Sequence, residues 1–169
     1  MFDAILIGGG DILRKSQNVP DHVRRAMSVG NLAPTEAYLS TVLPYLSKIE
    51  YMGKPIIMSS LGRWHGEEKA ILESADKANH PIKAVILLDL DENEAKARAQ
   101  SRDIVNRGNR ADDALEYLHT RFDEFRAKTV PVIDYYKKLG LLIEVNGQQQ
   151  PADVTSEILQ KLERYASKN

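Results

Sequence analysis

Short apolar runs alternate with longer amphipathic stretches along the whole chain. Runs that are apolar at every position are typical of strands covered by helices on both faces. The four predicted strands are Ala4–Ile7, Pro55–Ser59, Lys83–Leu88 and Leu141–Val145. Helical periodicity fills the segments between them. This alternation predicts an α/β domain with a mostly parallel sheet.

Two short helical pieces are expected after the first strand. Asp11 is placed to cap a helix that begins at Ile12, because an aspartate side chain accepts hydrogen bonds from the free N–H groups of a first turn. Pro20 interrupts this helix. A second piece runs to about Val29 and ends at Gly30, the residue type that most often follows a helix.

Prolines shape the longer helices. Pro34 stands where a first-turn proline would open a helix to about Glu50, and Pro44 should kink that helix. Pro131 should bend the longest one. Asp91 is placed to cap the helix after the third strand. The remaining predicted helices are Glu67–Asn79, Glu92–Asn106, Asp112–Leu139 and Ala152–Ala166.

Composition narrows the class of protein. The chain has 169 residues, which predicts a single domain over residues 1–169 with a substantial core. A net charge of −1 argues against a nucleic-acid binder held by bulk electrostatics, although it leaves room for a local basic pocket. There is no cysteine, and no histidine spacing suggests a metal site. No secretion signal or membrane-length apolar run occurs, so we expect a cytoplasmic protein that does not bind membranes.

Four arginines gather around a short glycine-bearing loop between two helical stretches. Arg98 and Arg102 are four residues apart and share a helix face, Arg110 lies in the loop, and Arg121 lies on the next helix. Guanidinium groups match phosphate oxygens and hold them with two parallel hydrogen bonds. From spacing alone, a solvated pair of charged helices with weak surface salt bridges remains the alternative interpretation.

The order of these arginines resembles a known family. R-x3-R, a short loop, R-A-D-D and TRF-x-EF, followed by KTVPVIDYYKKLGLLIEVNG, resembles the carboxy-terminal half of adenylate kinases and related nucleoside monophosphate kinases. The resemblance implies a doubly wound parallel sheet with helices on both faces, as in P-loop kinases. It also implies an acceptor-binding flap over about 12–50 and a short lid over Asp103–Ala111. The implied reaction is transfer of a phosphoryl group from ATP, with Mg²⁺ bridging the donor phosphates, to a nucleoside monophosphate.

The resemblance assigns the donor side of this reaction to the second half of the chain. Arg98 would flank the base of ATP, and Arg102 would also bind ATP. Arg102, Arg110 and Arg121 would clamp the transferring phosphates. Gln149, in the segment GQQQP, falls where the family has a loop near the ATP base, although an ordinary turn is the alternative.

Two further arginines are assigned to the phosphate of the acceptor. GGGDILR resembles a family segment whose final arginine grips that phosphate, and this residue is Arg14. PIIMSSLGRWHGEE falls where the family has a strand followed by a second acceptor-phosphate arginine, here Arg63, which would also act in catalysis. Trp64 or His65, directly after Arg63, is a candidate for stacking on a base, with a place at the rim or in ordinary packing as the alternative.

The acceptor base is assigned to three segments. SVGNLAPTE resembles the family segment whose backbone frames this base, here at Asn31, Leu32 and Ala33. Gly9 replaces a threonine near the base. Glu67 replaces the glutamine that reads adenine, and an ionised carboxylate cannot offer the donor of an amide. Which base is accepted therefore depends on the ionisation of Glu67.

Two more features depart from the family pattern. Ser59 replaces an aspartate that helps to hold Mg²⁺ through water, and the lysine loop GxxxxGK[ST] occurs nowhere in the sequence. Either Met1 is an internal or misassigned start of a truncated family member, or FDAILIGGGD takes the central place in the sheet and binds an anion through backbone N–H groups. A nucleotide-binding module without turnover is therefore the alternative to a kinase. We expect small-molecule nucleotides as partners, and a monomer.

Overall fold

The computed structural model describes residues 4–59, 62–101 and 115–168. The chain divides into two compact units, one made of Met1–Ile82 with Arg110–Val132 and the other of Lys83–Asn109 with Ile133–Asn169. The predicted lid lies outside the described residues, as do Arg102 and Arg110. The single domain over the whole chain stays a prediction.

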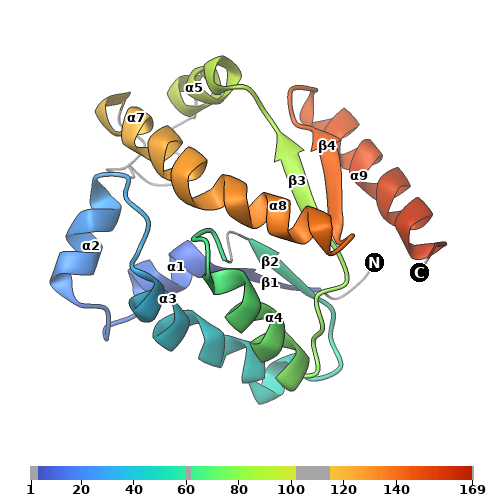
Figure 1. Cartoon of the computed structure of the whole chain (residues 1–169), viewed down its shortest axis with the longest axis horizontal. Helices are drawn as coiled ribbons and strands as arrows, with labels where there is room; N and C mark the ends of the chain where they lie inside the picture. Colours follow the sequence, from blue (N-terminus) through green and yellow to red (C-terminus); the bar gives the residue numbers. More distant parts are fainter. Residues whose placement is uncertain (1–3, 60–61, 102–114, 169) are drawn as a thin grey trace. The chain divides into compact units, whose positions relative to one another are not determined.

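The first unit contains a parallel pair of strands. β1 (Ile5–Gly8) pairs with β2 (Ile56–Ser59), with Ile5 opposite Ile56 and Gly8 opposite Ser59 (Figure 1). Both strands lie where apolar runs predict them. Leu6 and Ile57 face each other across the pair and are 71% and 59% exposed. The expected burial on both faces is therefore wrong for this pair, because only the Ile7 side packs against the core.

Helices and 3₁₀ turns from the first 82 residues build much of the rest of the first unit. They are α1 (Gly9–Lys15), α2 (Asp21–Ser28), α3 (Thr35–Val42), η1 (Leu43–Ser47), η2 (Ile49–Tyr51) and α4 (Glu67–Lys77). One apolar cluster joins their buried faces to β1. Its most deeply buried members are Val23, Val42, Leu46, Ile71 and Ala75. This core positions the ends of β1, α1 and α4, where the candidate site lies.

Two predicted helix starts need correction. α1 begins at Gly9 and not at Ile12, so Asp11 lies in its first turn and makes an ion pair with Arg14 in place of a cap. The carboxylate is also close to the strand end, since a Cβ added at Gly8 would lie 2.9 Å from Asp11 Oδ2. Pro34 is the N-cap of α3 and not its first residue.

Proline also shortens the helix that was expected to run to Glu50. α3 ends at Val42, and the chain continues as the 3₁₀ turns η1, which contains Pro44, and η2. Pro44 cannot donate the backbone hydrogen bond that an α-helix requires, so the chain tightens where a kink was predicted.

The longest predicted helix is interrupted before its proline. α7 (Leu115–Glu124) leads into a π-helical turn, η4 (Phe125–Thr129), and then into α8 (Val130–Lys138). Pro131 lies just beyond the wide turn. A proline ring clashes with the carbonyl four residues earlier in a regular helix, and the π turn relieves this crowding. The predicted distortion is thus confirmed, and it takes the form of a π turn.

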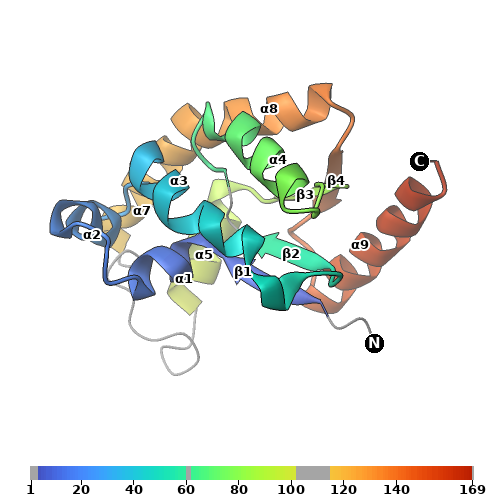
Figure 2. The same ribbon diagram turned by 90° about the horizontal axis from the view of Figure 1, so that it is seen from below.

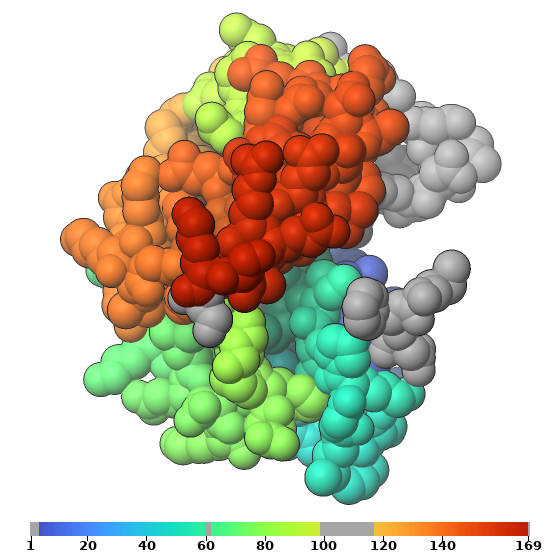
Figure 3. Space-filling model, turned by 90° about the vertical axis from the view of Figure 1, so that its right-hand side faces the viewer, coloured from blue at the N-terminus to red at the C-terminus, as the bar shows by residue number. Residues whose placement is uncertain are grey.

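The second unit holds the other parallel strand pair. β3 (Val85–Asp89) pairs with β4 (Leu142–Asn146), with Val85 opposite Leu142 (Figure 2). α5 (Glu92–Ser101) begins with the predicted cap, because the N–H of Glu94 donates to Asp91 Oδ1 at 2.8 Å. α9 (Pro151–Ala166), drawn in red in Figure 3, packs on β4 and has no fully buried residue.

The described strands therefore confirm the α/β class with parallel pairing. They form two separate two-stranded sheets, β1–β2 and β3–β4. A single doubly wound sheet stays a prediction. Of the helices that the structure describes, none is both long and apolar enough to cross a membrane.

Candidate functional site

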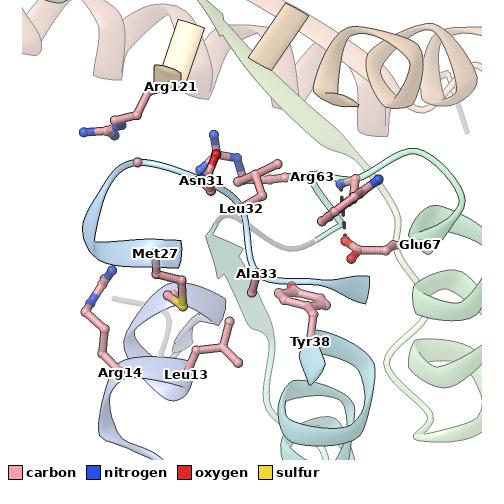
Figure 4. A pocket seen from close by; sticks show the side chains of 13 residues that line it. Leu13, Arg14, Met27, Asn31, Leu32, Ala33, Tyr38, Arg63, Glu67 and Arg121 are labelled. Carbon is pink, nitrogen blue, oxygen red and sulfur yellow. Dashed lines mark hydrogen bonds between the residues drawn. The ribbon is translucent and has the colours of Figure 1, made fainter. Parts of the chain in front are cut away.

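A pocket in the first unit collects most of the residues that the sequence assigns to the acceptor. It is lined by cationic, apolar and acidic side chains from α1, the turn after α2, α3, the segment before α4, and α7 (Figure 4). Arg14, Arg63 and Arg121 supply three guanidinium groups to it, and Glu67 supplies a carboxyl group. In Figure 4, Arg14 and Arg121 lie on one side of the pocket and Glu67 lies on the opposite side.

The side chain of Arg14 extends from the last turn of α1 and passes close to Gly10. A Cβ added at Gly10 would lie 3.2 Å from Nη2 of Arg14, so the guanidinium passes close over the helix backbone. Nη2 also donates to Asp11 Oδ1 at 2.6 Å. This ion pair is largely exposed, and such pairs contribute only about 0–1 kcal/mol. A phosphate can therefore replace Asp11 as the partner of Arg14 at small cost.

Arg63 and Arg121 come from segments far apart in the sequence. Arg63 lies in the segment between β2 and α4, where its carbonyl oxygen accepts a hydrogen bond from Thr129 Oγ1 at 2.9 Å. Arg121 lies on α7, with its Cγ beside Gly30. The π turn and α7 thus hold both arginines against the same cavity.

Apolar side chains form the walls between the charged ends. The set consists of Leu13, Met27, Leu32, Ala33, Tyr38 and Trp64. The hydroxyl oxygen of the buried Tyr38 accepts a hydrogen bond from the N–H of Gly62 at 3.2 Å, which ties α3 to the segment that carries Arg63. Walls of this kind suit a flat aromatic ring better than a small polar ion.

Glu67 is the acidic end of the pocket. It is the first residue of α4 and only 2% exposed, and its Oε2 accepts a hydrogen bond from the N–H of Trp64 at 3.3 Å. Burial raises the pKa of Glu67 above its ordinary value, and hydrogen bonds from the Trp64 backbone and the Thr35 side chain oppose that rise. Because the group is buried and lines the cavity, it can present hydrogen-bonding oxygens to a bound molecule.

The turn after α2 is fixed by a long-range contact. Gly30 has φ +92°, and a Cβ there would lie 3.0 Å from both Arg121 Cγ and the carbonyl oxygen of Tyr117. Beyond it, the N–H of Leu32 donates to Glu124 Oε2 at 3.1 Å. The backbone of 30–33, which the resemblance assigns to the acceptor base, is therefore held directly against α7.

The carboxylate of Glu124 is also connected, through Lys128, to Trp64 in the pocket wall. Glu124 Oε2 lies 2.6 Å from Nζ of Lys128, and this ammonium lies 3.7 Å from the centroid of the Trp64 ring. The carbonyl oxygen of Lys128 accepts a hydrogen bond from the N–H of His65 at 3.0 Å. Lys128 and Thr129 both belong to the π turn, so this distortion fastens the segment between β2 and α4.

The second unit brings together two of the residues assigned to ATP. Arg98 donates through Nε to Glu94 Oε1 at 2.7 Å and through Nη2 to the backbone oxygen of Gln149 at 3.2 Å. The side-chain amide of Gln149 instead donates to the backbone oxygen of Asn146 and to Glu157. Arg98 therefore contacts the backbone of Gln149, while the Gln149 side chain is held by Glu157.

Several assigned residues line the pocket and others do not. Those that line it are Arg14, Asn31, Leu32, Ala33, Arg63, Glu67 and Arg121. Gly9 is buried at the start of α1 outside the lining, and its neighbour Gly10 takes that place. Arg102 and Arg110 cannot be placed, since they fall outside the described residues.

Sequence reasoning missed part of the site. Leu13, within GGGDILR, was given no role in the site, and Met27 and Tyr38 belong to no motif; only their apolar character within short amphipathic helices indicates burial. Glu124 and Lys128 lie within the motifs TRF-x-EF and KTVPVID, but nothing in the sequence indicates their contacts, because their partners Leu32 and Trp64 lie far away in the chain. In the described part of the chain, no three His, Cys, Asp or Glu side chains come together as metal ligands.

Comparison with known proteins places these residues in a family. No protein-family model matches the chain. Adenylate kinase of Encephalitozoon cuniculi is 31% identical over 161 residues, covering 93% of this chain and 82% of the relative. Adenylate kinase of Prochlorococcus marinus (strain MIT 9211) is 29% identical over 154 residues, covering 89% and 78%. Adenylate kinase of Methanosarcina barkeri is 27% identical over 188 residues, covering 95% and 87%. The chain therefore belongs to the adenylate kinase family.

Proposed function

We propose that this protein is a nucleoside monophosphate kinase that moves a phosphoryl group from ATP to a nucleoside monophosphate. The observation that supports this function is the division of the first-unit pocket into a cationic side and an acidic, apolar side. A nucleoside monophosphate has the same division, with a dianionic phosphate at one end and an aromatic base at the other.

Arg14 and Arg63 are the proposed ligands of the acceptor phosphate. Both guanidinium groups line the cavity and both offer forked donors that match phosphate oxygens. Arg121, on the same cavity, is placed in this proposal next to the transferring group. Arg102 and Arg110 are proposed to join it from the side of ATP.

The reaction needs positioning and charge neutralisation. An oxygen of the acceptor phosphate attacks the γ-phosphorus of ATP, and the bond from that phosphorus to the β,γ-bridging oxygen breaks. The products are ADP and a nucleoside diphosphate. Negative charge spreads over the γ-phosphoryl oxygens in the transition state, so arginines around them accelerate the step. A single well-placed arginine contributes about 10³–10⁵-fold in related phosphoryl transfers.

ATP and Mg²⁺ are the proposed cofactors, and Arg98 and Gln149 the proposed neighbours of the ATP base. Mg²⁺ keeps several waters and binds chiefly through substrate phosphates in enzymes of this kind. It therefore does not require a cage of protein ligands, and the described residues offer no cluster of three acidic or histidine side chains. The residues of this chain would hold the phosphates to which the ion is bound.

A coupled phosphoryl-transfer assay of the full chain tests this function, with ATP, Mg²⁺ and each common ribonucleoside monophosphate. We expect turnover with at least one acceptor. Arg121→Ala should remove turnover and leave monophosphate binding largely intact, whereas Arg14→Ala should weaken monophosphate binding. Arg126→Ala is the matched control, because Arg126 is an exposed arginine that pairs with Asp123 outside the pocket. Equal binding of monophosphate by wild type, Arg14→Ala and Arg121→Ala would refute the assignment of these two arginines.

A binding module without turnover is the second candidate. Ser59, the last residue of β2, favours it, since it stands where the family resemblance expects an aspartate that helps to hold Mg²⁺. A sample whose melting temperature rises with ATP or a monophosphate, but which gives no product in the assay, would support this candidate over the kinase.

A further inference from the structure

The acidic end of the pocket differs from an amide in its hydrogen-bonding capacity. Glu67 accepts hydrogen bonds from the N–H of Trp64, from Thr35 and from the backbone of Arg63, and it also lines the cavity, where it can meet a bound molecule. In its ionised form, the form to which the inference applies, this carboxylate offers acceptors and no donor. A base that fits this end must therefore present N–H groups to it.

The common bases differ in this respect. The Watson–Crick edge of guanine carries two adjacent N–H donors, one on the ring at N1 and one on the exocyclic amine at N2. The corresponding edge of adenine carries one donor, on the N6 amine, beside the acceptor N1. A carboxylate pairs with both donors of guanine, but it places an acceptor against N1 of adenine. A glutamine side chain has one donor and one acceptor, the pattern that matches adenine.

Resting on the proposed function, we infer that Glu67 makes this pocket selective for a guanine nucleoside monophosphate over its adenine counterpart. The orientation follows from the pocket itself. Arg14 and Arg121 lie on the side opposite Glu67, so a phosphate bound by the arginines directs the base toward the carboxylate (Figure 4). Tyr38 and Trp64 line the same pocket, and the N–H of Trp64 donates to Glu67, so both residues provide aromatic surfaces for a flat ring.

The size of the preference follows from hydrogen-bond chemistry. A good bidentate contact to a base edge discriminates against the wrong base by about 1–3 kcal/mol in other systems, which corresponds to roughly 5–150-fold. We therefore expect GMP to bind at least about fivefold more tightly than AMP. IMP shares the N1–H of guanine and lacks the N2 amine, so it should bind the wild-type chain more weakly than GMP.

The chain carries its own probe for the experiment. Trp64 is the only tryptophan in the sequence and lines the pocket, so its fluorescence reports binding. The full-length wild type, Glu67→Gln and Glu68→Gln are titrated with GMP, AMP and IMP. Glu68→Gln is the matched control, because Glu68 is the next residue on α4 and 3% exposed but does not line the pocket. Arg14→Ala is titrated to show that the signal comes from the acceptor site.

The expected result is a GMP preference in wild type and Glu68→Gln that shifts by about fivefold or more toward AMP in Glu67→Gln. If the Arg14-dependent site binds AMP as tightly as GMP in the wild type, the inference is wrong while the proposed function stands. An unchanged GMP-to-AMP ratio in a folded Glu67→Gln variant would also overturn it. If no monophosphate binds the wild type at all, the proposed function and this inference both fall. The wild-type comparison of GMP, IMP and AMP decides the matter even if the variant does not fold.

Discussion

The ammonium of Lys128 lies 3.7 Å from the centroid of the Trp64 indole, on a side chain that also pairs with Glu124 at 2.6 Å. Glu124 in turn accepts the backbone N–H of Leu32 at 3.1 Å. These contacts join the backbone expected to frame the base to the tryptophan on the same pocket. The pocket walls are thus coupled through two charged groups on α7 and the π turn.

Replacing Lys128 should loosen this coupling. We expect Lys128→Met to lower the free energy of unfolding by about 1 kcal/mol, the usual size of a cation–π contact at a partly buried site. The Trp64 emission should also change, because a charge beside the indole ring is removed. Urea denaturation followed by Trp64 fluorescence measures both effects. Lys69→Met, on the exposed side of α4, is the control and should change neither.

Glu124 should contribute more to the free energy of unfolding than an exposed carboxylate does. Glu124→Ala leaves the N–H of Leu32 without this acceptor and Lys128 without this partner, so we expect a loss of about 1–3 kcal/mol in unfolding free energy. Asp123→Ala removes an exposed carboxylate from the preceding position and should cost less than about 1 kcal/mol. Equal losses in the two variants would show that the contact with Leu32 contributes little.

Gly30 combines a left-handed backbone with a close neighbour. Gly30→Ala should lower the unfolding free energy by about 2–4 kcal/mol, because a Cβ adds conformational strain and presses against the backbone of Tyr117. Gly53 also has positive φ, at +72°, but a Cβ there meets nothing within 4 Å. Gly53→Ala should therefore cost only the strain, about 1–2 kcal/mol. Chemical denaturation of both variants separates strain from crowding, and identical losses would contradict the crowding of Gly30.

Glu67 should make stability depend on pH. Burial raises the pKa of this carboxyl, and the charge of Glu68 adds to the rise, whereas hydrogen bonds from Trp64, Thr35 and the backbone of Arg63 oppose it. The folded state therefore binds the proton more tightly than the unfolded chain, and ionisation of Glu67 costs stability. Lowering the pH through the raised pKa should stabilise the wild type relative to Glu67→Gln.

Unfolding free energies of the wild type and Glu67→Gln, measured from about pH 7 to about pH 4, check this sign. Glu73→Gln, which removes an exposed carboxylate from the same helix, corrects for the general effect of losing one negative charge. The prediction would be contradicted if the difference in unfolding free energy between wild type and Glu67→Gln stayed constant over this range. It would also be contradicted if lowering the pH stabilised Glu67→Gln relative to the wild type.

Local pattern was enough to predict most elements of the fold. Apolar runs located β1, β2, β3 and β4 to within about two residues, and Asp91 was identified correctly as a cap. The predicted helix start was wrong where a side chain could act either as a helix cap or as an ion-pair partner. Asp11 is suited to capping, yet it lies inside α1 and pairs with Arg14, because the helix continues back into the glycines.

The site was predictable only where a residue type carries chemistry or where a segment resembles a known family. Arg14 and Arg63 could be proposed because the segments around them resemble those of a known family, and Arg121 because it also belongs to a cluster of guanidinium groups suited to phosphate. The structure brings all three to one pocket. The contacts that hold the pocket together could not be proposed in this way. Glu124 resembles any carboxylate on an amphipathic helix until the fold brings Leu32 to it across 92 positions.

The π turn has a consequence for helical phase. In a regular α-helix, each residue is rotated by about 100° about the helix axis relative to the one before it. A π turn contains one additional residue, so it changes the direction in which all later side chains point. Deleting one residue from Phe125–Thr129 would leave the composition of the helix nearly unchanged. It would nevertheless rotate Thr129, which donates to the carbonyl of Arg63, relative to Arg121. The placement of these two arginines therefore depends on the number of residues between Arg121 and Thr129 as much as on their identity.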